Sequence, residues 1–127
     1  MRTVLRVIIG LIGLFNITIG LGFLLAPEKL AAAFFLEPLG TQGMATLRAD
    51  FPGFFIGASV FALLGAWSGQ ARPLLVPILM LSLALFGRFV SLALDDMTPT
   101  AAQPMIAEAV MITLLVLGWR NFDKPRR

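Results

Sequence analysis

Long apolar stretches alternate with short polar ones along the whole chain. Four apolar stretches stand out, at about residues 4–25, 44–67, 73–94 and 104–119. Each is close to the roughly 20 residues that an α-helix needs to cross the hydrocarbon of a bilayer. The pattern predicts an all-α protein, in which residues 1–127 form a single integral membrane domain, a bundle of four transmembrane helices.

The polar segment between the first two stretches, APEKLAAAFFLEPLGTQG, predicts one more, short helix. Pro27 and Glu28 suit a first helical turn, and Pro38 is a stop signal. Leu30, Ala33, Phe34 and Phe35 would be buried, so we expect this helix to lie along the outer membrane interface. It is either a plain interfacial helix or a lid over the polar residues described below.

Composition supports the membrane class and excludes several chemistries. Hydrophobic residues make up 58% of the chain and charged residues 13%, whereas about a quarter of the residues of soluble domains are charged. Cysteine, histidine and tyrosine are absent, which excludes thiol redox centres, cysteine or histidine zinc sites and Ser-His-Asp triads. The sequence predicts no metal and no cofactor, and the catalytic residues of any reaction stay unknown.

Charge sets the expected orientation in the membrane. One side of the predicted bundle holds most of the basic residues, against the single acid Asp123: Arg2, Arg6, Arg72, Arg120, Lys124, Arg126 and Arg127. Basic loops stay on the cytoplasmic side, so both termini are predicted to be cytoplasmic. Membrane orientation thus explains the basic residues behind the net charge of +3. For this reason we expect no nucleic-acid partner.

Strongly polar residues within the predicted spans gather in the outer half of the membrane. The stretch LRADFPGF places Arg48 and Asp50 near the outer end of the second helix. At 1.5 Å per residue, Arg88 lies about 9 Å below the outer surface and Asn16 about 14 Å below it. Glu108 lies about one turn inside the outer end of the fourth helix.

Energetics predict that these residues face inward and pair. An unpaired charge facing lipid costs about 2.5 kcal/mol or more at depth. Arg48 and Asp50 point about 200° apart on a regular helix, so each needs a partner on another helix. Arg88 with Asp50 or with Glu108 are the natural pairs.

One face of the third helix extends this polarity to the outer surface, because Ser91 and Asp95 follow Arg88 at i+3 and i+7. A wet cleft open to the outside would fit such a strip. We name the predicted set the polar cluster, and it is either a ligand-binding or a structural set: Asn16, Arg48, Asp50, Arg88, Ser91 and Glu108.

Pro52 leaves two alternatives for the second helix. It offers no N–H to the carbonyl of Arg48, so a continuous helix carries an unpaired acceptor and a kink. Alternatively the helix starts at Asp50, with Pro52 in its first turn. We favour the longer helix. Gly53 and Gly57 form a GxxxG pair that predicts close helix packing.

The stretches LRADFPGFFIG, GRFVSLALDD and AEAV resemble a family of small four-helix bacterial membrane proteins, domain of unknown function 4345, which is similar in outline to DoxX-like proteins. The resemblance covers nearly the whole chain and implies a multi-pass protein of the bacterial inner membrane. It implies that Arg48, Asp50, Arg88 and Glu108 are the positions of interest, but it implies no activity. Pro52 departs from the pattern, since a small residue is expected there.

Three classes of function fit the sequence. In the first, the polar cluster binds a small amphiphile or a lipid of the surrounding bilayer. In the second, the cluster is structural, and the chain is an accessory subunit or assembly factor within a homo-oligomer or larger membrane complex. In the third, Asp50 or Glu108 is the general acid or base of a membrane enzyme. A cavity beside Arg88 and Glu108 would favour binding. An exposed face of small residues would favour the subunit.

Overall fold

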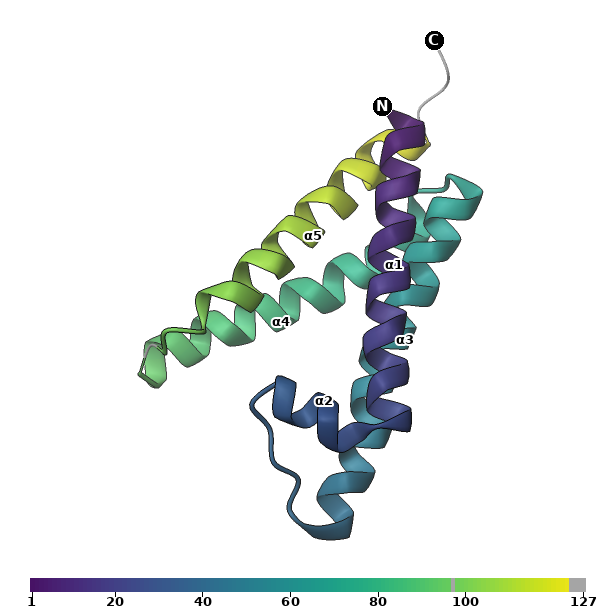
Figure 1. Ribbon diagram of the computed structural model, residues 1–127. Coiled ribbons are helices and arrows are strands. Elements are labelled where there is room, and N and C mark those ends of the chain that lie inside the picture. Colours follow the sequence, from purple (N-terminus) through teal and green to yellow (C-terminus); the bar gives the residue numbers. More distant parts are fainter. Residues whose placement is uncertain (97, 124–127) are drawn as a thin grey trace.

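The computed structural model describes residues 1–96 and 98–123, and its secondary structure there is entirely helical. The elements are α1 (Arg2–Leu25), α2 (Pro27–Ala33), α3 (Gly40–Ser68), the 3-10 turn η1 (Arg72–Leu74), α4 (Leu75–Leu94) and α5 (Ala102–Phe122) (Figure 1). Four helices, α1, α3, α4 together with η1, and α5, are long and apolar enough to cross a membrane. The predicted all-α fold with four spans and one short helix is confirmed.

The helices form two antiparallel pairs that meet at one end of the molecule. α1 and α3 run side by side, whereas the α4–α5 hairpin diverges from them toward its tip (Figure 1). The start of α1 and the end of α5 lie together, and we name this the terminal end and the opposite one the distal end. Lys124, Arg126 and Arg127, which contribute to the predicted orientation, lie outside the described residues.

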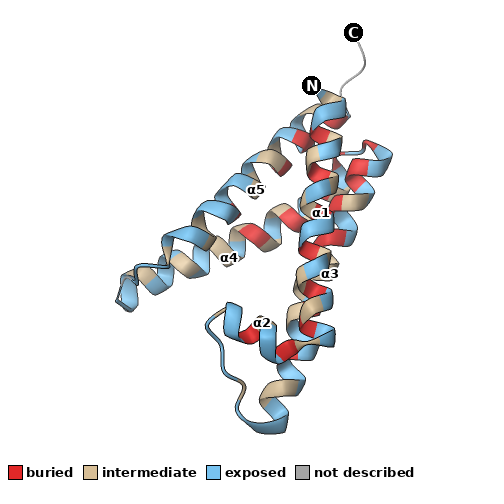
Figure 2. Cartoon of the chain, viewed as in Figure 1, coloured by how far each residue is buried: buried red, intermediate tan, exposed pale blue. Residues whose placement is uncertain are grey.

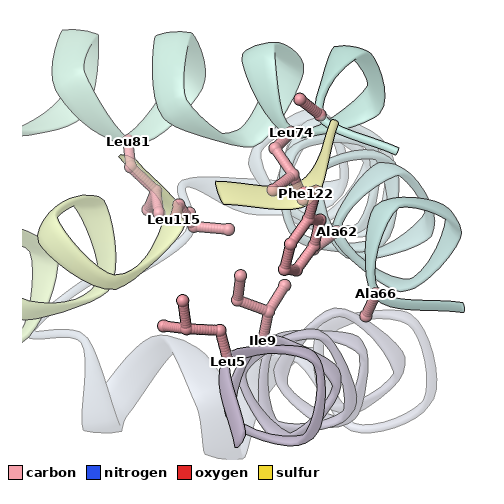
Figure 3. Close-up of a cluster of buried hydrophobic side chains, with 9 residues drawn as sticks. Leu5, Ile9, Ala62, Ala66, Leu74, Leu81, Leu115 and Phe122 are labelled. Carbon is pink, nitrogen blue, oxygen red and sulfur yellow. The ribbon is translucent and has the colours of Figure 1, made fainter. Parts of the chain in front are cut away.

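A hydrophobic cluster at the terminal end joins all four long helices, and we name it the terminal core. It consists of Leu5, Ile9, Ala62, Ala66, Ala71, Leu74, Leu81, Leu115 and Phe122. Figure 3 shows Ile9, Leu74 and Phe122 pointing toward one another, and all three are fully buried. The distal parts of α4 and α5 are mostly exposed (Figure 2), so the hairpin is held mainly at one end.

Glycines of α1 bring α1 and α3 into close contact. A Cβ added at Gly20 would lie 2.6 Å from Cγ1 of Ile56 and 3.2 Å from the Ile56 backbone nitrogen. Small residues that admit a neighbouring backbone are the usual basis of helix pairing in membranes. The packing predicted for Gly53 and Gly57 is not found, because an added Cβ at either meets nothing within 4 Å. These two glycines lie on an open face of α3.

Phenylalanines hold α2 against the distal ends of α1 and α3. The ring of Phe23 is fully buried, and its centroid lies 5.1 Å from that of Phe34 and 4.6 Å from that of Phe51. α2 begins at Pro27, as predicted, but it ends at Ala33 rather than at Pro38. The expected burial of Ala33 and Phe35 is wrong, since both are exposed. The chain turns away there, because Phe35 has a positive φ of 58°, a conformation that no helix continues.

α3 runs without interruption from Gly40 to Ser68, with Pro52 inside it. The longer of the two alternatives for the second helix is therefore observed, and the helix does not start at Asp50. Arg48, whose carbonyl faces the missing N–H of Pro52, is exposed near the distal end.

Two arginines of α1 cap the C-terminal end of α3, an arrangement that we name the terminal clamp. Arg2 Nη2 donates to the carbonyl of Gly69 over 3.0 Å, and Arg6 Nε donates to that of Ala66 over 2.6 Å. Arg6 Nη2 also donates to the carbonyl of Trp67. The last carbonyls of a helix lack partners within it and carry partial negative charge, so guanidinium groups stabilise them.

The α1–α3 contact predicts that Gly20→Ala lowers the free energy of unfolding by about 1–3 kcal/mol, the usual cost of overpacking. Gly57→Ala is the matched control, since an added Cβ there meets nothing within 4 Å. Removing this helical glycine should leave the stability unchanged or raise it by up to about 1 kcal/mol. Unfolding by SDS in mixed micelles measures both variants, and equal losses would contradict the packing described.

The terminal clamp predicts that Arg6→Ala destabilises the fold by about 1–3 kcal/mol, because two charged hydrogen bonds to partly exposed carbonyls are lost. Arg120→Ala removes the same charge from an exposed position at the same end and should change stability by no more than about 0.5 kcal/mol. The same unfolding titration compares the two. Similar losses would mean that the basic charge, rather than the capping, matters.

Candidate functional site

An ion pair joins the two helices of the diverging hairpin. Nε of Arg88, on α4, donates to both carboxylate oxygens of Glu108, on α5, over 2.9 and 3.0 Å. The side chain of Arg88 is 39% exposed and that of Glu108 is 11% exposed. Of the two pairings predicted for Arg88, the one with Glu108 is observed.

The inward face of α5 carries Glu108 into this position. The buried residues of α5 are Glu108, Leu115, Gly118 and Phe122, which lie along one side of a helix with 3.6 residues per turn. Leu115 and Phe122 belong to the terminal core. Glu108 thus continues the same face beyond the core, where α4 alone supplies its ion-pair partner.

Arg88 uses only part of its hydrogen-bonding capacity. A guanidinium group has five N–H donors, one on Nε and two on each Nη. Both hydrogen bonds to Glu108 start from Nε, and neither Nη nitrogen donates to any residue that the structure describes. The donor end of this partly exposed cation therefore has no acceptor among the described residues.

Asn16 of α1 is buried beside the same face of α5. It is 6% exposed, and its Nδ2 donates to the Ile12 carbonyl over 2.9 Å and to Met111 Sδ over 3.5 Å. Met111 lies three residues after Glu108, so their side chains are neighbours on α5, with about 5–6 Å between the Cβ atoms. We name the set Arg88, Glu108, Met111 and Asn16 the polar line, since it connects α4, α5 and α1.

The remaining members of the polar cluster lie apart from this line. Ser91 is exposed, and its Oγ donates to Oδ2 of Asp95 over 2.7 Å. Arg48 and Asp50 are exposed on α3, and neither forms an ion pair with any residue in the described ranges. The reason is the splay of the helices: this part of α3 packs on α1 and α2, whereas the hairpin diverges from it (Figure 1).

Met111 is the member of the polar line that the sequence reading missed. A methionine among leucines carries no polar signal, and its thioether acts as an acceptor here only because α1 presents an amide to it. The available signal was its spacing from Glu108, which places both side chains on one face of the helix.

Two surface hollows are formed elsewhere on the molecule. One, of about 420 Å³, is lined by Met1, Arg2, Thr3 and Arg6 at the terminal end. The other, of about 330 Å³, is an open apolar groove along α5 between Ile106 and Leu114. Neither is lined by Arg88 or by Glu108, so neither is the cavity predicted beside this pair. The ion pair lies between α4 and α5, with the Arg88 side chain 39% exposed.

The comparisons with known proteins identify a family but no activity. A family model described as Domain of unknown function (DUF4345) matches residues 4–119. No curated protein and no solved structure matches the chain significantly. The matched range includes α3 and α4, most of α1 and α5, and every residue of the polar line.

The ion pair predicts a coupling between Arg88 and Glu108 that a double-mutant cycle measures. Arg88→Met leaves a mostly buried carboxylate without its partner, so it should destabilise the fold, and Glu108→Met should do the same for the cation. The free energy of unfolding that the double variant loses should be smaller than the sum of the two single losses by about 1 kcal/mol or more. Additive losses would show that the pair contributes nothing to stability.

Proposed function

Since the chain belongs to the family described as Domain of unknown function (DUF4345), which assigns it no activity, we propose a function from the site itself: the protein binds a small amphiphile or lipid, whose polar group bonds to Arg88. The tail of this ligand stays in the bilayer. Charge asymmetry predicts that the site opens to the outer leaflet.

The observation that carries this proposal is the unused donor end of Arg88. Glu108 holds Nε, and the two Nη groups have no acceptor within the described residues. A guanidinium group in or near hydrocarbon is stabilised only when its donors are satisfied. Two oxygen atoms of one head group fit the fork of the Nη groups, as in the pairing of arginine with carboxylate, phosphate or ester oxygens.

Glu108 supports the binding role by fixing and neutralising Arg88. Both of its oxygens accept from the single Nε–H, so that edge of the guanidinium is aimed at the carboxylate and the Nη groups face away from it. The ion pair as a whole carries no net charge, which removes most of the attraction for a bare anion. The pair therefore favours a head group that offers oxygen acceptors with little net charge.

Apolar side chains beside Arg88 provide a surface for the tail. Phe86, Phe89 and Val90 on the same stretch of α4 are 65%, 56% and 38% exposed. An amphiphile that approaches sideways from the bilayer can place its head on Arg88 and keep its chain along these residues. No closed pocket is needed for such a site.

A second function is supported by a separate observation, the open face of α3. Gly53 and Gly57 have free space where a Cβ would stand, and Asp50 is exposed on the same side of the helix. A helix of another membrane protein could pack closely there. In that case the chain is an accessory subunit, and its ion pair is structural. For Glu108 as the general acid or base of an enzyme there is no such support, because both of its oxygens are engaged by Arg88.

Native mass spectrometry of the protein, extracted gently from its own membrane, tests the proposal. We expect a small-molecule adduct on the wild type that Arg88→Ala loses at least tenfold, since a fork of charged hydrogen bonds contributes about 1.5–3 kcal/mol or more. Arg48→Ala is the matched control, an exposed arginine near the same end, and should keep the adduct. Arg88→Lys keeps the charge for Glu108 but lacks the fork, and it should bind weakly while remaining folded.

Each other outcome has a definite meaning. An adduct that survives Arg88→Ala and Arg88→Lys contradicts the proposed site. A wild type that carries only other polypeptides, and loses them in Gly57→Ile but not in Arg88→Ala, supports the accessory-subunit function in its place.

A further inference from the structure

The amide of Asn16 has one hydrogen-bonding atom that the protein leaves unused. Nδ2 is identified unambiguously, because its partner at 2.9 Å, the Ile12 carbonyl, can only accept. The other amide atom, Oδ1, is therefore an acceptor, and no described residue donates to it. Asn16 is nevertheless only 6% exposed.

Oδ1 of Asn16 lies at an opening and is not sealed within the protein. Every fully enclosed side-chain nitrogen or oxygen among the described residues has a hydrogen-bond partner. Since Oδ1 has none, it belongs to the atoms that reach the surface. The contact of Asn16 with Met111 places this opening where α1 and α5 begin to separate, since further along α1 the side chain of Phe23 packs on α2 and α3.

This opening is adjacent to the site proposed for the head group. Glu108 and Met111 are neighbours on α5, three residues or about 4.5 Å apart along the axis. Arg88 contacts the first and Asn16 contacts the second. A ligand whose polar group extends along these two residues would meet the Nη donors of Arg88 at one end and the Oδ1 acceptor of Asn16 at the other.

From these two complementary atoms we infer the class of the ligand: an uncharged amphiphile that carries both an ester or similar oxygen acceptor for Arg88 and a hydroxyl donor for Asn16. The inference rests on the proposed function of the same site. Asn16 acts as a specificity-determining residue, because a ligand without the hydroxyl leaves Oδ1 without a donor in a mostly buried position. Monoacylglycerols are the simplest lipids with this pattern.

A matched pair of probes tests the inference on the full chain in detergent. Monooleoylglycerol and methyl oleate share the acyl chain and the ester, and only the first has hydroxyl groups. Native mass spectrometry of an equimolar mixture gives their ratio on the protein. We expect the wild type to prefer monooleoylglycerol about fivefold, as one net hydrogen bond provides.

Two variants separate the acceptor from the structural role of Asn16. Asn16→Leu removes Oδ1 at similar volume, and the ratio should fall to about one while binding of methyl oleate persists. Met111→Leu removes only the thioether that bonds Nδ2, so it should keep the preference. If Asn16→Leu unfolds, Asn16→Asp keeps an oxygen acceptor and should keep the preference for the hydroxyl-bearing probe.

The outcomes distinguish this inference from the proposed function. A wild type that binds both probes equally, with binding lost in Arg88→Lys, overturns the role of Asn16 and leaves the site at Arg88 intact. A preference that survives Asn16→Leu has the same meaning. If neither probe binds the wild type, or if Arg88→Lys binds both unchanged, the proposed function fails as well.

Discussion

Hydrocarbon offers no hydrogen bonds, and this constraint governs where every polar group of the chain is found. The described backbone is helical in all four spans, so its amide groups are satisfied within each helix, apart from the helix ends and the Arg48 carbonyl opposite Pro52. The hydroxyl groups of Thr18, Ser59 and Thr113 donate to carbonyls one turn earlier on their own helices. The last carbonyls of α3 have no donor within the helix, and Arg2 and Arg6 donate to them. Against this background, the Nη groups of Arg88 and Oδ1 of Asn16 have no partner among the described residues. Unlike the exposed Arg48 and Asp50, they belong to a partly buried and a buried side chain.

The fold creates these exceptions because the two helix pairs are joined mainly at one end. The terminal core fixes the hairpin against α1 and α3, and the distal parts of α4 and α5 diverge from them (Figures 1 and 2). A bundle closed along its whole length would bring α3 to the ion pair and let Asp50 share Arg88. Since the helices splay, Arg88 has one protein partner and remains half exposed. The unused donors are thus a consequence of the architecture.

Much of the fold could be predicted from the sequence, because membrane spans are set by length and hydropathy. The span predicted at about residues 73–94 corresponds to η1 and α4, Arg72–Leu94. The pairing of Arg88 with Glu108 followed from the cost of isolated charges in lipid. The divergence of the two helix pairs could not be predicted, since it depends on side-chain packing. A Cβ added at Gly20 would meet Ile56, whereas one added at Gly53 or Gly57 meets nothing within 4 Å. For the same reason Arg48 and Asp50 could not be separated from the site, and Met111 could not be added to it.

The central claim is that Arg88 presents its Nη groups to a ligand from the bilayer while Glu108 holds Nε. A crystal structure of the wild type grown from a lipid mesophase tests it most directly. The account predicts elongated density along Phe86 and Phe89 that ends within hydrogen-bonding distance of the Arg88 Nη atoms. Nη atoms bonded only to water, or to an acceptor of a second protein chain packed on the hairpin, would contradict it.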